Sequence, residues 1–215
     1  MKTNSHNPFQ GVLNWRDKVK VCGTMDLEGI LVNLGFDPDT LKYRQSNVEG
    51  VMVDRMNLDP VVFDVKGVPL SYQREAVWSI KECQLLLKSI YSGIDIGKIV
   101  IRKNGYDTLA KLIKKGYDGK IAFNDIVDGK QRLIALISFI KCEYPDAGGY
   151  YFSDFTSGAK RRFLGFTGLT VCEILPGVSD AEVLQTFLNV NVAGVKVDEK
   201  HLKKVQMLLE KHKFF

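Results

Sequence analysis

Apolar residues fall into two kinds of pattern along the chain. Short, nearly continuous apolar runs bounded by turn residues predict buried strands, and these runs cover 61–65, 98–102, 121–127 and 169–175. Apolar positions that recur every three or four residues predict helices over 26–33, 80–92, 109–115, 131–141, 180–189 and from 198 onward. The mixture of strands and helices predicts an α+β or α/β domain.

Capping residues mark where three of these helices begin. Ser79 is followed three residues later by Glu82, which is the spacing of a capping box. Ser179 stands directly before the helix predicted from residue 180, and Thr24 is the expected N-cap of the first short helix. These polar residues therefore fix the predicted starts more closely than the apolar pattern alone.

The chain is predicted to have three parts. Residues 1–60 form a loop-rich N-terminal arm with one short helix, because two Asp-Pro breaks occur between residues 36 and 60. Residues 61–197 contain most of the predicted strands and helices and form the main domain. Residues 198–215 form a C-terminal amphipathic helix, whose apolar line is expected to pack on the core.

Composition narrows the class of protein. The chain has 215 residues, of which 45% are hydrophobic and 26% charged, and these values exclude a wholly disordered, collagenous or coiled-coil protein. The four cysteines are widely spaced without a CxxC pair, which excludes a zinc ribbon and suits a reducing compartment. No apolar run reaches 18 residues and the first residues are polar, so we expect no membrane span, no signal peptide and a cytoplasmic location.

The most informative stretch for function joins a predicted strand to a predicted helix through Asp128 and Gly129. Glycine permits a sharp turn, and the free amides of the first helical turn favour an anion. Lys130 and Arg132 add positive charge, and arginine can bind a phosphate with two parallel hydrogen bonds. Asp128 would repel an anion, so three roles stay open for it: holding Mg²⁺, orienting a water molecule, or fixing Arg132.

The segment DGKQRL from Asp128 to Leu133 resembles the DGQQR motif of the DUF262 family, the N-terminal domain of GmrSD-type restriction enzymes. Three further segments are similar to motifs of this family and occur in its order. They are YQREAVWS over 72–79, KRRFL over 160–164, and FLNVNVAG over 187–194. The main departure from the family pattern is Lys130, which stands where the first glutamine of the motif is usual.

The resemblance implies a ParB/sulfiredoxin-like fold, in which helices pack on a small mixed sheet and a C-terminal helix follows. It also implies a pocket that binds a nucleoside triphosphate (NTP) and hydrolyses it, with Mg²⁺ as the cofactor and Asp128 as the metal ligand. Binding without hydrolysis is left open. The catalytic residues carried over are Asp128, Gln131, Arg132 and Arg74. The nucleotide-binding residues are Gln73, Arg74, Asp128, Gly129, Lys130, Gln131, Arg132, Asn189 and Asn191. Tyr72 and Trp78 are expected to be packing residues.

The family's usual fusion partner is an HNH-type nuclease domain, which needs clustered histidines and aspartates. This chain has three histidines, His6, His201 and His212, and two of them lie near its ends. The resemblance therefore implies that the domain acts with a separate nuclease or another defence protein. The expected setting is the cytoplasm of a bacterial or phage-infected bacterial cell.

Three alternatives to a nucleotide-binding domain stay open. A ParB-like DNA-binding protein or nuclease would use the net charge of +5, with Arg161 and Arg162 as candidate nucleic-acid contacts. An ATP-dependent phosphotransferase would use the same turn with another acceptor. A non-enzymatic, phage-encoded interaction protein would bind a host defence component instead.

Overall fold

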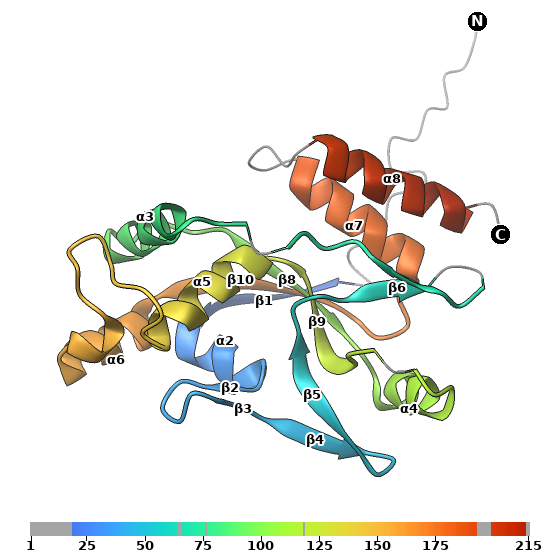
Figure 1. Cartoon of the computed structure of the whole chain (residues 1–215), viewed down its shortest axis with the longest axis horizontal. Coiled ribbons are helices and arrows are strands. Elements are labelled where there is room, and N and C mark those ends of the chain that lie inside the picture. The colour runs from blue at the N-terminus through green and yellow to red at the C-terminus, as the bar shows by residue number, and fades with distance from the viewer. Residues whose placement is uncertain (1–18, 64–65, 76, 118, 193–198, 214–215) are drawn as a thin grey trace, which may run out of the picture.

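The computed structural model describes residues 19–63, 66–75, 77–117, 119–192 and 199–213. Within these ranges six strands form one mixed sheet (Figure 1). Their order across the sheet is β1 (Val19–Asp26), β10 (Gly168–Ile174), β8 (Lys98–Lys103), β9 (Ala122–Asp128), β5 (Val51–Asn57) and β4 (Gln45–Val48). The pairs β10–β8 and β5–β9 are parallel, and the other neighbours are antiparallel. This mixed sheet with its helices confirms the α+β fold class.

Helices cover both faces of the sheet. One face carries α2 (Leu27–Asn33), α3 (Ile80–Tyr91), α5 (Lys130–Ile140) and α6 (Ser157–Phe166), and the other carries α7 (Asp180–Val192) and α8 (Glu199–Lys213). A further helix, α4 (Tyr106–Lys114), packs beside β4 and β5. The short elements are β2 (Phe36–Asp37), β3 (Lys42–Tyr43), β6 (Val61–Phe63), β7 (Pro69–Ser71) and a 3₁₀ turn over Phe152–Asp154.

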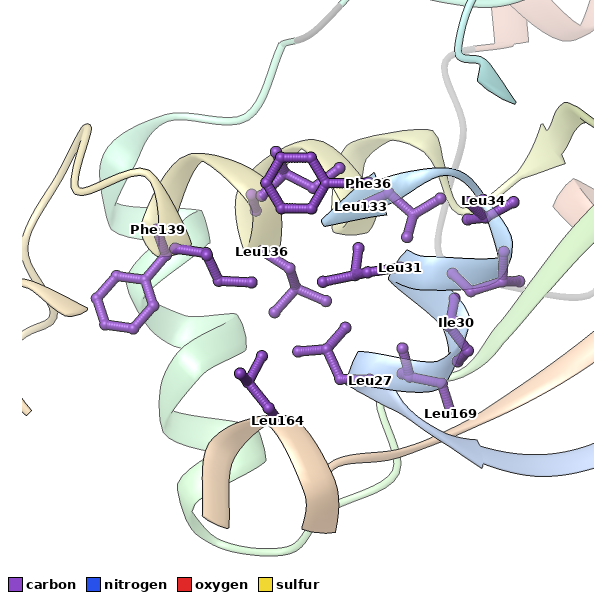
Figure 2. Close-up of a cluster of buried hydrophobic side chains, with 14 of the residues drawn as sticks. Leu27, Ile30, Leu31, Leu34, Phe36, Leu133, Leu136, Phe139, Leu164 and Leu169 are labelled. Carbon is purple, nitrogen blue, oxygen red and sulfur yellow. The ribbon is translucent and has the colours of Figure 1, made fainter. Parts of the chain in front are cut away.

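Leucine side chains of α2 and α5 meet in the centre of the larger core (Figure 2). Leu27 and Leu31 of α2 and Leu133 and Leu136 of α5 are all fully buried. Burial of one such side chain contributes about 1.5–3 kcal/mol to stability. This packing holds α5 against the sheet and so fixes the position of its first turn, which is the turn singled out in the sequence.

The central strand β8 supplies apolar residues to both cores. Ile99 and Ile101 belong to the core under α5, whereas Val100 belongs to the core under α7 and α8. Successive strand residues point to opposite faces, so a strand covered on both sides must be apolar at consecutive positions. This explains why the continuous apolar runs of β8, β9 and β10 were readily predicted as strands.

Aromatic side chains confirm two packing predictions. Tyr72 is 1% exposed, and its ring contacts Phe187 of α7 edge-on with the centroids 5.4 Å apart. Burial raises the pKa of its hydroxyl well above the usual value, as expected of an uncharged core residue. Trp78 is partly buried against the core under α5. The apolar line of α8 is confirmed as well, since Val205 and Leu209 are buried in the core under α7.

The structure corrects two predictions for the N-terminal part. Asp26, rather than Thr24, caps α2, because its carboxylate accepts a hydrogen bond from the Gly29 amide. Residues 36–60 are not loop-rich, since β2, β3, β4 and β5 lie within them. Two of these strands, β4 and β5, extend the main sheet beyond β9, so the predicted boundary at residue 60 falls between strands of one sheet.

Candidate anion site at the start of α5

The sharp turn between β9 and α5 depends on Gly129. Its backbone has φ 94° and ψ 6°, a left-handed conformation that other residues rarely adopt. A Cβ atom at this position would lie 2.4 Å from Cδ1 of Ile99 on the neighbouring strand. A side chain at residue 129 would therefore force the end of the fully buried Ile99 side chain to move.

The amides at the start of α5 lack partners within the helix. No side chain caps the helix at Gly129, and the first helical hydrogen bond runs from the Leu133 amide to the Gly129 carbonyl at 3.0 Å. The amides of Lys130, Gln131 and Arg132 come before this first donating amide and so have no acceptor within the helix. Together with the partial positive charge of the helix end, they are suited to an anion.

Arg132 is fixed by Asp128 and by a loop carbonyl. Its Nη2 lies 2.8 Å from Oδ2 of Asp128, and its Nη1 donates to the Ile96 carbonyl at 2.8 Å. Gly97 leaves room for this guanidinium, because a Cβ there would lie 2.6 Å from Nη1. Of the three roles left open for Asp128, the structure shows that of fixing Arg132.

Lys130 is directed inward and not toward the open side of the turn. Its side chain is only 6% exposed, and its ammonium donates to the Asp59 carboxylate and to the Arg74 carbonyl. These bonds tie α5 to two segments that lie more than 50 residues earlier in the chain. The ammonium is thus neutralised by Asp59 and adds little charge to an anion site.

The two glutamines of the predicted site bind backbone groups. Gln131 accepts from the Val77 amide at 3.0 Å and donates to the Glu75 carbonyl at 2.7 Å. Gln73 donates to the carbonyls of Ile126 and Val127 on β9, at 2.7 and 2.8 Å. Both side chains therefore hold the segment around Arg74 against β9 and α5, which brings the predicted YQR and DGKQR motifs together.

Arg74 lies within this assembly, and its side chain is half-buried. In the ranges that the structure describes, no hydrogen bond or ion pair engages its guanidinium, although its carbonyl accepts from Lys130. A guanidinium without a partner is available to bind an anion with two parallel hydrogen bonds. The Arg74 carbonyl is joined to Lys130, and Asp128 is joined to Arg132, so the predicted catalytic residues all lie at or beside the first turn of α5.

The remaining predicted residues lie elsewhere. Asn189 and Asn191 are on α7, and their amides bond to Gln185 and to the Phe187 carbonyl within that helix. Arg161 and Arg162 are exposed on α6, which packs through Phe163 against Phe139 near the far end of α5. Neither pair is hydrogen-bonded to the turn in the described part of the chain.

Metal ligands are sparse in the described residues, where no group of three or more His, Cys, Asp or Glu side chains could hold a metal ion. Mg²⁺ is commonly held by one or two carboxylates together with substrate phosphates, so a site of this kind needs no such group. Asp128 is the one carboxylate within the turn itself, and one of its oxygens already binds Arg132. A role for Mg²⁺ therefore stays a prediction.

Sequence reasoning missed a second polar site, a pocket of about 230 Å³ beside β9. Asn57, Arg102 and Asp125 line it from three strands, together with Asp180 at the start of α7. The sequence does carry a signal for this pocket, the polar pair Asn124-Asp125 inside an apolar strand. Buried polar residues of a strand need hydrogen-bond partners, so the pair indicates a polar site beside β9.

Part of the chain matches a known protein family. Residues 66–170 match the GmrSD restriction endonuclease N-terminal domain. This segment belongs to that family. The matched part of the GmrSD N-terminal domain includes Gln73, Arg74 and the whole turn from Asp128 to Arg132, and it ends before α7. No curated protein and no solved structure gives a significant match. Within the described ranges, no helix has the length and apolar character needed to cross a bilayer.

Proposed function

We propose that the chain binds the phosphates of an NTP at the start of α5 and hydrolyses it, as part of a phage-defence restriction system in which a partner cuts DNA. The observation that carries the proposal is that the uncapped start of α5 contacts the backbone of Arg74, whose guanidinium has no hydrogen-bond or ion-pair partner among the described residues. The membership of residues 66–170 in the GmrSD N-terminal family supports the restriction context.

The chemistry follows from the positions of the donors. Phosphate oxygens accept hydrogen bonds from the amides of the first turn of α5, while Arg74 neutralises part of the negative charge. Arg132, held by Asp128, keeps the turn in shape and presents its remaining N–H groups. When bound, Mg²⁺ supplies charge neutralisation on the phosphates, and Asp128 is the carboxylate that would hold it.

Binding is tested by titrating the protein with ATP, GTP, CTP and UTP, each with and without Mg²⁺, in a thermal-shift assay. At a ligand concentration of 100 Kd, binding stabilises the folded state by about 2.7 kcal/mol. For a chain of this size each kcal/mol raises Tm by about 2–4 °C, so a shift of roughly 5–11 °C is expected. Phosphate release then measures hydrolysis.

The decisive variant is Arg74→Ala, since no described contact depends on its guanidinium and the fold should survive. We expect it to weaken nucleotide binding at least tenfold, because a charged hydrogen bond contributes about 1.5–3 kcal/mol. The matched control is Arg161→Ala, which removes the same charge from the exposed side of α6. Equal binding by both variants, or no shift with any nucleotide, would contradict the proposal.

A further inference from the structure

Three polar side chains lie side by side across the sheet, away from the turn. Asp125 of β9 is paired in register with Asn57 of β5 on one side and with Arg102 of β8 on the other. Residues opposite each other on neighbouring strands share a face of the sheet, so the three side chains point the same way. Together they line the pocket of about 230 Å³ that α4, β6 and the start of α7 close around.

The cations near this pocket already have anionic partners. Arg102 forms an ion pair with Asp180 at 2.8 Å and also donates to the Val178 carbonyl. Asp180 is further engaged by the Phe63 amide, at 2.8 Å. Lys120, at the edge of the pocket, pairs with Asp54 at 3.3 Å. In the described residues Asp125 forms no such ion pair, because the neighbouring Arg102 is engaged by Asp180.

Asp125 is 8% exposed, and in the described residues no ion pair joins its carboxylate to a cation. Asn104 donates to its Oδ2 at 2.8 Å, and the amide of Asn57, which donates to the Lys120 carbonyl at 3.2 Å, lies on the paired strand beside it. A carboxylate can accept about four hydrogen bonds. Asp125 therefore retains acceptor capacity for two more donors, and the pocket is the space from which they can come.

The other walls of the pocket are apolar and aromatic. Val61, Leu109 and Leu112 line it, as do the rings of Phe63 and Tyr117, which contact each other edge-on at 5.2 Å. The volume lies below the roughly 300–1,000 Å³ of pockets that hold drug-sized ligands. Such a space suits a small flat ring with donors on one edge.

We propose that this pocket binds a guanine-type nucleobase, whose two adjacent N–H donors bond to the Asp125 carboxylate. Adenine does not present this pair of donors, and an anion would be repelled by Asp125. The pocket is separate from the turn at α5, so the inference does not depend on phosphate binding there.

The test uses guanosine, which has no phosphate, in isothermal titration at pH 8. At that pH the Asp125 carboxyl is ionised, since burial raises its pKa to about 6. We expect guanosine to bind, inosine to bind roughly ten- to hundredfold more weakly because it lacks the exocyclic amine, and adenosine not to bind. Arg74→Ala, whose guanidinium makes no described contact, should leave guanosine binding unchanged, which separates this pocket from the turn.

Two variants test the pocket by different means. Asp125→Asn keeps the size of the side chain and removes its charge, and Thr108→Tyr fills the pocket from α4 while leaving the carboxylate in place. Each should weaken guanosine binding at least tenfold, whereas Asp107→Asn, an exposed acid on the same helix outside the pocket, should not. Absence of guanosine binding to the wild type, unchanged binding by Asp125→Asn, or preference for the guanidinium compound agmatine would overturn the proposal.

Discussion

Replacing Gly129 with alanine tests whether the turn before α5 has the geometry described above. Two separate effects should destabilise the variant. The left-handed backbone, with φ 94°, costs an alanine about 1–2 kcal/mol. The new Cβ would also lie 2.4 Å from Cδ1 of Ile99, and overpacking of this kind costs about 1–3 kcal/mol.

Alanine also restricts the unfolded chain, and this effect stabilises the folded state by about 0.4–1 kcal/mol. The net loss in the free energy of unfolding should therefore be about 1–4.5 kcal/mol. Gly50→Ala is the matched control, because Gly50 has a similar φ of 83° but nothing within 4 Å of its would-be Cβ. It should lose at most about 1.5 kcal/mol, since the clash is missing there.

Urea unfolding of the two variants and the wild type measures the cost of the left-handed backbone and the cost of the steric clash. The double variant Gly129→Ala/Ile99→Val removes the clashing methyl group and should recover part of the steric loss relative to Ile99→Val alone. If Gly129→Ala and Gly50→Ala lose the same stability, then the Ile99 side chain does not obstruct a Cβ at the turn as the structure shows. The reasoning for the turn would then be refuted.

Two other predictions concern buried polar groups. The pKa of Asp125 is raised by burial to about 6, so its charged form destabilises the folded state above that pH. The free energy of unfolding of Asp125→Asn, relative to that of the wild type, should therefore rise by up to about 3 kcal/mol between pH 4 and pH 8. Urea unfolding of both proteins at the two pH values measures this change. A difference in stability that is the same at both pH values would contradict the prediction. Gln131→Leu should lower the free energy of unfolding by only about 1 kcal/mol, because the Val77 amide and the Glu75 carbonyl that it releases can bind water instead. Hydrogen exchange at the Val77 amide should become faster. Unchanged exchange would argue against the hydrogen bond between Val77 and Gln131.

The elements with local signals were predictable from sequence. The capping box of Ser79 and Glu82 is present in the structure, and α3 begins at the next residue. Strands buried on both faces, such as β8, were recognised from continuous apolar runs. By contrast, β5 is apolar at scattered positions and becomes a strand through its pairing with β4 and β9. Its sequence alone could not indicate that pairing.

The turn of the candidate site was predictable from sequence, but the hydrogen bonds that join it to distant segments were not. The change from strand to helix at Gly129 follows from local sequence, and the structure has it at that residue. The partners of Lys130 and Gln131 lie 54–71 residues away in the chain, so no local pattern could reveal them. The same holds for the pocket at Asp125, which depends on the register of three strands.

The charges around the turn indicate which side chain an anion would depend on most. Asp128 and Arg132 largely cancel each other, and Lys130 is neutralised by Asp59. Lys130, which stands where the family has a glutamine, therefore links α5 to the Asp59 and Arg74 segments and adds no net charge to the site. The positive end of α5, equivalent to roughly half a charge, and the guanidinium of Arg74 remain. Arg132 also supports the fold of the turn, so loss of binding in Arg132→Ala could reflect either a lost anion contact or a distorted turn. Loss of binding in Arg74→Ala would reflect the lost anion contact alone.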